Sequence, residues 1–275
     1  MTSSGNNIVG YGICGPNEKY LDKTLKCFDS LCDTVVLLTN NTDPDSVRKI
    51  REMGFEVRED NREWGLNQNK IKEDFVSTLG EYNPDWLVCL DMDEVLHVER
   101  EELEQMMTKC NSMSVYIVNL WEKGWKRRWS FWNVRVWKWN GVTKFANRPL
   151  HCGLAPEWAY HYASAVPIPL IHRGLKDREA RQRKIARYKK YDPTAKYRDK
   201  SYYDALADDT YEEYDLEKIQ ESLDEEIREV VMKQPRDIRD KKFYIVESPD
   251  GRQMDIPEAS LEETLKRGFK LINEI

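Results

Sequence analysis

Three carboxylates follow directly on an apolar run in the first half of the chain. The segment Pro84–Leu96 reads PDWLVCLDMDEVL, and its run Trp86–Leu90 leads into Asp91, Asp93 and Glu94. Charge repulsion and the cost of burying carboxylates oppose such a cluster unless a cation offsets both. In an extended segment residues two apart point the same way, so the two aspartates are expected to face one point while Met92 faces the core.

Hard oxygen ligands of this kind suit Mg²⁺ or Mn²⁺, which keep further positions for water and substrate phosphates. A metal beside phosphates can neutralise a departing diphosphate. The pattern therefore predicts a divalent metal site. The alternative is an ordinary solvated acidic loop, because aspartate and glutamate often follow strands.

The elements that must position these carboxylates alternate regularly along the first hundred residues. Apolar runs and turn residues predict strands at residues 6–15, 33–42, 55–60 and 85–93, with helices at 17–32, 43–54 and 67–82 between them. This alternation is typical of a parallel α/β sheet, and near-continuous apolar runs fit a sheet covered on both faces. Ligands of such sheets bind at the carboxyl ends of the strands, where Asp91 and Asp93 fall.

The rest of the chain follows another pattern. It predicts a helix at 101–110, strands at 114–122 and 165–174, a hairpin at 132–145 turning at Asn140-Gly141, a basic helix at 177–193, an acidic helical stretch at 202–234, and a final hairpin around Asp250-Gly251 with a helix at 258–272. We expect three parts: a main α/β domain over residues 1–200, an acidic helical segment over 201–235, and a small C-terminal hairpin–helix module over 236–275.

Composition narrows the classes of partner and compartment. The 275 residues carry a formal net charge of -6, so no global basic field attracts nucleic acid, which is not expected as a partner. No apolar run approaches the ~20 residues that span a bilayer, and the opening MTSSGNNIVGYGICG lacks the basic and apolar regions of a signal peptide. Six cysteines without a CxxC pair favour a reducing compartment, so we expect a cytoplasmic protein without stable membrane insertion.

Several segments, in order, resemble those of family-two inverting glycosyltransferases with the GT-A fold, a nucleotide-sugar-binding, Rossmann-like mixed sheet. The similar segments are GICGPNEKYLDKTL, VVLLTNNTDPDS, WGLNQNKIKEDF, DWLVCLDMDEVL with its DxD motif, VRVWKWNGVTKFANRPLHCGL and IHRGLKDREARQRKIARYKKYDP. Together they cover residues 8–193. The resemblance implies a metal-dependent transfer of a sugar from a nucleoside diphosphate donor to a hydroxyl of a glycan or other acceptor.

The resemblance also implies roles for individual residues. Asp91 would lie near the donor ribose and a metal-bound water, Asp93 would coordinate the metal, and His172 would be a further metal ligand or a diphosphate contact. An imidazole ligand favours Mn²⁺ over Mg²⁺; the alternative is a strand-end histidine satisfied by backbone. The residues implied to border the nucleotide are Cys14, Gly15, Asn17, Thr39, Asn40, Asn41 and Asn69.

Two departures from the family pattern affect these roles. Asn40 and Asn41 stand where the family has an acidic residue after the second strand, although amides can still hydrogen-bond a base. His151 is followed by Cys152 where the family often shows His-Glu, so the obvious general base is missing. Since inversion needs one base within reach of the acceptor hydroxyl, the candidates are Glu157, then Glu94, then His151.

Six tryptophans between Trp121 and Trp139 alternate with lysines and arginines. Flat aromatic rings complement the apolar faces of sugars, and the cations could meet a diphosphate or an acidic glycan. The alternative is that the two-residue period marks core tryptophans with solvated cations. Likewise the basic stretch Arg173–Lys190 is an ordinary charged face, or lies over the diphosphate or an anionic membrane.

The function favoured by the sequence is a nucleotide-sugar-dependent glycosyltransferase. The alternatives are a nucleotidyltransferase on a similar sheet, a non-catalytic carbohydrate-binding protein on a degenerate transferase scaffold, and a transferase acting on modified DNA bases. The C-terminal 35 or so residues cannot build a core alone, so they are expected to pack on the main domain or to mediate self-association or docking.

Overall fold

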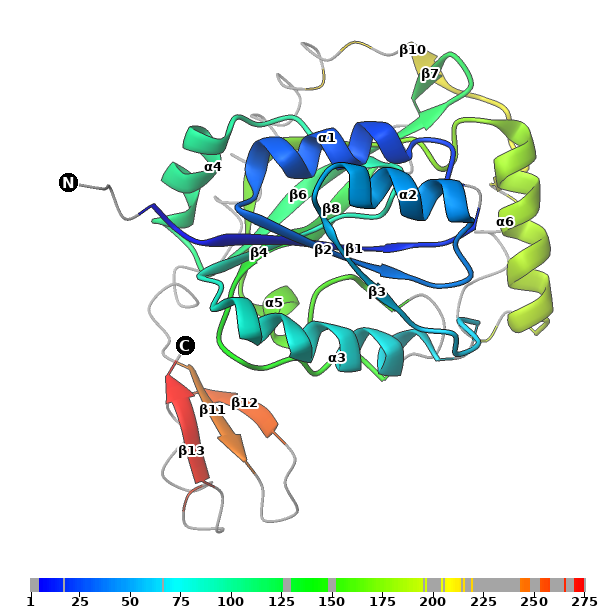
Figure 1. The fold of residues 1–275 in the computed structure, drawn as a ribbon. Helices are drawn as coiled ribbons and strands as arrows, with labels where there is room; N and C mark the ends of the chain where they lie inside the picture. Colours follow the sequence, from blue (N-terminus) through cyan, green and yellow to red (C-terminus); the bar gives the residue numbers. More distant parts are fainter. Residues whose placement is uncertain are drawn as a thin grey trace.

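The computed structural model describes residues 5–16, 18–65, 67–125, 130–147, 152–194, 196, 204, 206–213, 215, 219, 243–247, 253–257, 265 and 270–274. Most of them form one mixed sheet with helices on both faces (Figure 1). The expected α/β fold with a mixed sheet is therefore confirmed.

The first half of the sheet is parallel. Strand β1 (Ile8–Cys14) lies between β2 (Thr34–Thr39) and β4 (Trp86–Cys89), and β3 (Glu56–Glu59) lies outside β2. The connections are the helices α1 (Leu21–Leu31), α2 (Pro44–Glu52) and α3 (Gln68–Thr78), the last followed by the 3-10 helix η1 (Leu79–Tyr82). Because these strands are parallel, β1, β2 and β4 end at the same edge of the sheet, which is the carboxyl edge.

The second half is mixed. Strand β8 (Phe131–Lys138) pairs antiparallel with β4 on one side and with β6 (Ser112–Trp121) on the other. Strand β9 (Ala163–His172) is parallel to β6, and the short β5 (Glu94–Leu96) is antiparallel to β9. Strand β7 (Gly124–Trp125) pairs with β6 and with β10 (Glu212–Glu213).

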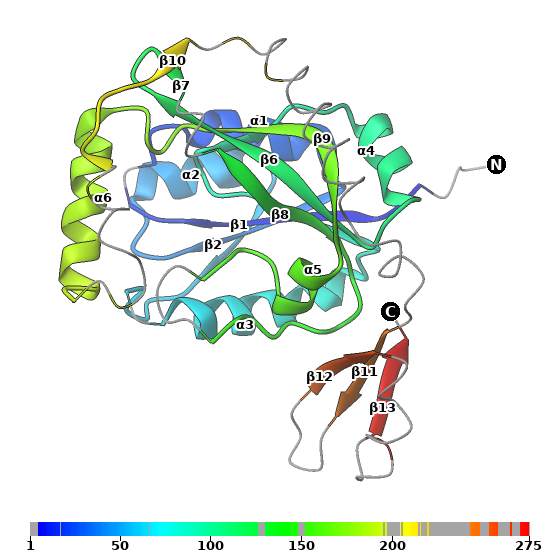
Figure 2. The ribbon, with the colours of Figure 1, turned by 180° about the vertical axis from the view of Figure 1, so that it is seen from behind.

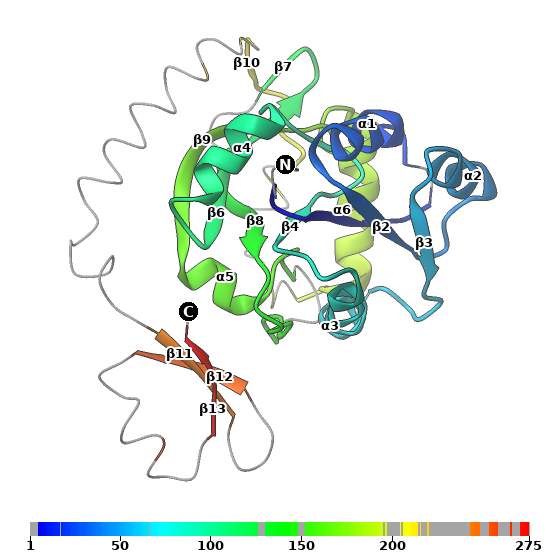
Figure 3. The ribbon, with the colours of Figure 1, turned by 60° about the vertical axis from the view of Figure 1, so that its left-hand side comes forward.

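Helices cover both faces of the sheet. Helices α1, α2 and α4 (Arg100–Met107) lie over one face, while α3 and α5 (Glu157–His161) lie over the other (Figures 1 and 3). Each helix turns its apolar residues to the sheet: in α1, Leu21, Leu25, Phe28 and Leu31 are buried at helical spacing. Two hydrophobic clusters result, one under α1 and one under α3.

Helix α6 (Arg178–Tyr191) crosses the carboxyl edge of the sheet (Figures 1 and 2). At its start, Lys19 in the loop after β1 pairs with Asp177 at 2.6 Å. At its end, the Tyr191 hydroxyl donates to Glu63, ahead of α3, at 3.2 Å. The helix is thus fixed on either side of the strand ends, and the predicted basic helix is confirmed.

The hairpin expected in the middle of the chain does not form. The hairpin over residues 132–145 is wrong, because residues 142–146 form no strand. Asn140 and Gly141 still make a turn, with φ of +81° at the glycine. The reason is that β4 and β6 already occupy both edges of β8, so no edge remains for a returning strand.

The C-terminal residues form a separate three-stranded sheet. Its strands are β11 (Phe243–Glu247), β12 (Gln253–Pro257) and β13 (Lys270–Glu274), antiparallel in the order β12-β11-β13. The pairing of β11 with β12 confirms the final hairpin, whose turn at Asp250-Gly251 lies outside the described residues. The helix predicted to reach residue 272 is wrong at its end, where the chain is strand β13. A two-stranded hairpin is marginal alone, so pairing with β11 overrides local helix propensity.

The acidic segment 201–235 falls mostly outside the described residues. Its described part contains strand β10, where only helix was expected. Strand β7 supplies the hydrogen-bonding edge for these two residues.

Candidate functional site

The acidic segment after β4 is a turn. Strand β4 ends at Cys89, β5 begins at Glu94, and the Glu94 N–H donates to the Asp91 carbonyl at 3.0 Å. Met92 is buried in the core, as expected. The expectation of an extended segment here is wrong, since the chain must leave the position of β4 to pair with β9. Strand alternation therefore does not aim Asp91 and Asp93 at one point.

Across the fold from Asp93 lies His172, at the last position of β9. Nε2 of His172 lies 3.5 Å from Oδ2 of Asp93, and both side chains are largely buried. The other carboxylate oxygen, Oδ1, is buried without a hydrogen-bond partner. Gly174 lies against the pair: a Cβ there would stand 2.0 Å from Oδ2 of Asp93. The glycine thus leaves room for the carboxylate.

Asn119 orients the imidazole from behind. Its Oδ1 lies 2.5 Å from Nδ1 of His172, and both residues are buried. A carbonyl oxygen only accepts, so Nδ1 donates to Asn119, and Nε2 is the ring nitrogen that faces Asp93. The alternative of a histidine satisfied by backbone is wrong, because the partner is a side chain on the neighbouring strand β6.

The electrostatics of Asp93 favour its charged form. Burial alone raises the pKa of this carboxyl, but the charge and hydrogen bond of His172 outweigh burial and hold the pKa below its usual value. Lys184 on α6 acts in the same direction. The site therefore holds a carboxylate with an unused, buried oxygen, which is a natural ligand for a cation.

Glu94 is occupied within the protein. Its two oxygens accept from Nε and Nη2 of Arg135, each at 2.7 Å, and one of them also accepts from the Asp91 N–H at 3.1 Å. Burial raises the pKa of Glu94, and Arg135 acts against that rise. Glu94 was expected among the candidates for the general base; its fixed ion pair with Arg135 removes it from them.

Glu18, which sequence reasoning missed, lies among the same acidic residues. Its carboxylate accepts from the Gly15 N–H at 3.1 Å. Burial raises the pKa of Glu18 to about 7, with further contributions from Asp93 and Asp91, while Arg187 on α6 opposes the rise. The sequence signal for it is the Asn-Glu pair after the first strand, whose other member, Asn17, lies outside the described residues.

Lys72 is a second residue that the sequence did not single out. Its ammonium is buried and donates to the carbonyls of Cys152 and Gly153 at 2.7 and 2.9 Å. Burial lowers the pKa of Lys72, and Cys152 and Asp91 act against that shift. Lys72 on α3 is thus held against the chain at Cys152 and Gly153.

The residues expected to border the nucleotide are placed unevenly. Asn40 is buried, and its amide donates to the carbonyls of Asp60 and Arg62 at 2.6 and 2.9 Å, so it holds the loop after β3. Thr39 similarly donates to the Arg58 carbonyl. Cys14 is buried, Asn69 is half-buried in the first turn of α3, and Gly15 and the exposed Asn41 lie at the carboxyl edge.

Of the remaining candidate bases, the structure describes Glu157 alone. Glu157 is exposed at the start of α5, where its N–H donates to the Lys144 carbonyl. Among the described residues, no hydrogen bond or ion pair joins Glu157 to Asp91 or Asp93. His151 lies outside the described residues.

The tryptophan stretch divides between buried and half-buried positions, and Arg135 within it is buried, where the core alternative expected solvated cations. Trp121, Trp125 and Trp137 are buried, so the core alternative holds for these three. Trp132 and Trp139 are half-buried, and Trp129 lies outside the described residues. Trp121 is packed under the guanidinium of Arg181 on α6, 4.4 Å from its ring centroid.

The residues at the turn fit a divalent cation that takes part of its coordination from a substrate. No group of three His, Cys, Asp or Glu that could hold a metal occurs in the described part of the chain. Two ligands at about 2.1 Å from one ion stand about 3.0 Å apart at a right angle and about 4.2 Å apart when opposite. The 3.5 Å between Asp93 and His172 lies within that range. A diphosphate would have to supply further oxygens.

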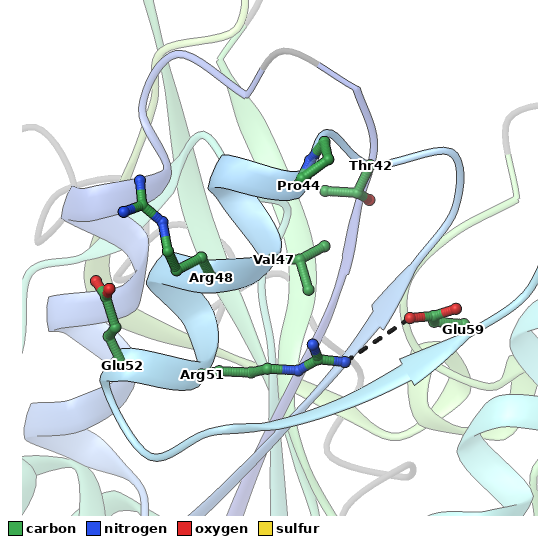
Figure 4. Close-up of a pocket in the computed structure, with 7 residues that line it drawn as sticks. All are labelled: Thr42, Pro44, Val47, Arg48, Arg51, Glu52 and Glu59. Carbon is green, nitrogen blue, oxygen red and sulfur yellow. Dashed lines mark ion pairs between the residues drawn. The ribbon is translucent and has the colours of Figure 1, made fainter.

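A separate groove lies between α2 and β3. It has a volume of about 550 Å³ and is lined by Thr42, Pro44, Val47, Arg48, Arg51, Glu52 and Glu59 (Figure 4). Arg51 pairs with Glu59 at 3.8 Å, and both side chains are exposed. These residues are not those of the acidic turn.

No described helix is long and apolar enough to cross a membrane.

No protein-family model matches the chain, and no curated protein matches it in sequence. Among solved structures, it is similar to S. aureus TarS, with 11% identity and a TM-score of 0.39 over 73% of this chain and 42% of that one. A structure of TarS 1-349 gives 12% identity and a TM-score of 0.40 over 73% and 69% of the two chains. Glucosyl-3-phosphoglycerate synthase from Mycobacterium tuberculosis, in complex with Mn²⁺ and uridine diphosphate, gives 13% identity and a TM-score of 0.30 over 41% and 44%. The chain thus spans less than half the length of the first of these TarS chains.

Proposed function

We propose that the protein is a metal-dependent glycosyltransferase that moves a sugar from a nucleoside-diphosphate-sugar to an acceptor hydroxyl, with inversion. The observation that carries the proposal is the Asp93–His172 pair at the carboxyl edge of the sheet. It combines a buried carboxylate oxygen without a partner, an imidazole that Asn119 holds with Nε2 facing that carboxylate, and a glycine that leaves space beside them.

In this proposal Asp93 and His172 hold Mn²⁺ or Mg²⁺ together with the donor diphosphate. When bound, the ion would supply Lewis-acid neutralisation of the leaving diphosphate. Asp91 lies beside the donor ribose, and the loop after β1, with Cys14 and Gly15, borders the nucleotide. Helix α6 brings Lys184 and Arg187 to the same edge, so the cost of gathering several carboxylates is partly offset by fixed cations.

Transfer with inversion requires a base on the acceptor side. The base takes the proton from the acceptor hydroxyl while the hydroxyl oxygen bonds to the anomeric carbon of the sugar. The bond from that carbon to the diphosphate breaks on the opposite face. Glu157 is the first candidate, because Glu94 is paired with Arg135. His151 is the second.

The proposal is tested with Asp93→Asn, which keeps the shape of the side chain and removes its charge. Donor hydrolysis and transfer should be lost, while the circular dichroism spectrum and melting temperature stay near those of the wild type. A thermal-shift screen of nucleoside diphosphates and nucleotide-sugars should show stabilisation that requires Mn²⁺ in the wild type and is absent in the variant. Full transfer activity in Asp93→Asn, or in excess chelator, would contradict the scheme.

Identification of the substrates consumed and the products released separates the alternatives. A nucleotidyltransferase would consume a nucleoside triphosphate and a sugar phosphate and release pyrophosphate. A non-catalytic carbohydrate-binding protein would bind donor without turnover on any acceptor.

We also propose a cytoplasmic location, which is supported by six cysteines that are all free thiols.

A further inference from the structure

A buried ion pair stands directly behind the acidic turn. Arg135 on β8 and Glu94 at the start of β5 have side chains that are 5% and 2% exposed. The contact is bidentate, with Nε and Nη2 each 2.7 Å from a carboxylate oxygen, and Nη1 donates to the Val134 carbonyl. The guanidinium therefore has one fixed position and fixes the carboxylate in turn.

Stability alone does not explain this pair. Taking two charges out of water costs much of what their attraction returns, and a well-packed apolar pair in the same place is often equally stable. A buried pair of this kind is therefore better explained by the arrangement that it imposes on its surroundings.

Glu94 fixes the turn at several points. The carboxylate accepts the Asp91 N–H, and the Glu94 N–H donates to the Asp91 carbonyl. The Glu94 carbonyl accepts from the Thr24 hydroxyl on α1 at 2.8 Å. In the pairing of β5 with β9, Glu94 stands opposite His172. Asp93, which lies inside this turn, is thus held from both sides.

We propose that Arg135 is a positioning residue: through Glu94 it holds the Asp91–Glu94 turn in the one conformation that brings Asp93 to His172. The inference rests on the proposed function for its catalytic consequence. The control of the turn by a residue on β8 does not depend on the identity of the substrate. The charge of Arg135 also neutralises Glu94, which keeps that carboxylate from competing for a cation beside Asp93.

The matched variants are Arg135→Met with Glu94→Met together, which replaces the ion pair by apolar side chains, and Arg135→Lys, which keeps the charge but loses the bidentate grip. The first readout is amide hydrogen exchange of the peptide that contains residues 90–96. The Asp91 N–H should exchange at least tenfold faster in the double variant than in the wild type, with Arg135→Lys between them. Unchanged exchange in both variants would overturn the inference, whatever the protein binds.

The second readout is Mn²⁺ binding, followed by electron paramagnetic resonance in the presence of a nucleoside diphosphate. Loss of a residue that orients metal ligands typically weakens metal binding by about 10- to 100-fold. We expect that range for the double variant, partial recovery in Arg135→Lys, and activity that returns at high Mn²⁺. Asp93→Asn should not be rescued by added Mn²⁺.

The outcomes separate the two proposals. Wild-type protein that binds no Mn²⁺ would reject the proposed metal-dependent function, while hydrogen exchange would still decide the role of Arg135. Wild-type binding with equal affinity in a folded double variant would reject the positioning role and leave the proposed function standing. If the double variant does not fold, Arg135→Lys carries the same two measurements.

Discussion

Gly174 offers a test of the site that changes no charged or metal-binding group. It lies two residues after His172, and its φ is outside the left-handed range, so alanine is compatible with the backbone. A Cβ at this position would lie 2.0 Å from Oδ2 of Asp93 and 2.9 Å from Nε2 of His172. Gly174→Ala therefore places a methyl group where the carboxylate stands.

The expected size of the effect follows from these distances. Ordinary contacts begin at 3.4 Å, so the Asp93 oxygen must move by about 1.4 Å, the difference between 3.4 and 2.0 Å. Metal–ligand distances tolerate only about 0.2 Å, so the displaced carboxylate is lost as a ligand and Mn²⁺ affinity should fall at least about tenfold, or ~1.4 kcal/mol. The free energy of unfolding should change by less than about 1 kcal/mol, because a gain of about 0.4–1 kcal/mol from the stiffer unfolded chain offsets the rotation of the Asp93 side chain.

The assay is a Mn²⁺ titration followed by electron paramagnetic resonance, with and without a nucleoside diphosphate, beside a urea unfolding curve. Gly5→Ala is the matched control, since its Cβ would make only an ordinary 3.6 Å contact with Glu104. The control should bind Mn²⁺ like the wild type. Wild-type affinity in a folded Gly174→Ala would refute the placement of Asp93 at the ion, even if the protein proved to be metal-dependent.

Three further predictions concern the surroundings of the site. Trp137→Ala should lower the free energy of unfolding in urea by about 3–5 kcal/mol, because the fully buried indole leaves a cavity; a loss under 1 kcal/mol would contradict its place in the core. Burial raises the pKa of Glu18 to about 7, above its unfolded value, so the Glu18 contribution to wild-type stability in chelator should fall as pH rises from about 4.5 to about 7. Glu18→Gln should therefore be more stable than the wild type at pH 8 but not at pH 4. Parallel stability–pH profiles of the two proteins would oppose this. Arg181→Ala should lower the free energy of unfolding by about 2–3 kcal/mol, because the Arg181 guanidinium lies 2.5 Å from the Asp209 carboxylate. The segment around Asp209 should then become sensitive to limited proteolysis; an unchanged digestion pattern would count against this role.

The parallel half of the fold could be predicted because its signals are local. Strands β1, β2 and β4 are short, mainly apolar runs that end in polar turn residues, and each helix shows apolar spacing on one face. The failures occur where pairing is decided by distant parts of the chain. The strand expected after Gly141 is absent because β4 and β6 already flank β8, and β13 forms because β11 offers a free edge.

The sequence pointed to the acidic residues and the histidine of the candidate site, but not to the side chains that hold them. Asp91 and Asp93 were found from an apolar run ending in acids, and His172 from resemblance. Their partners were not foreseeable, because Asn119 lies 53 residues from His172 and Arg135 lies 41 residues from Glu94 in the sequence. Sequence spacing carries no information about which side chain will stand behind another across a sheet.

The register of one short strand ties these residues together. Strand β5 has three residues, and its pairing with β9 sets Glu94 opposite His172. A slip of β5 by one residue could set Arg173, a cation, opposite Glu94 in place of His172. Three residues of ladder specify register weakly, so an anchor outside the ladder is required, and the bidentate grip of Arg135 on Glu94 supplies one. The geometry of Asp93 and His172 therefore depends on a residue that would touch neither the ion nor the substrate.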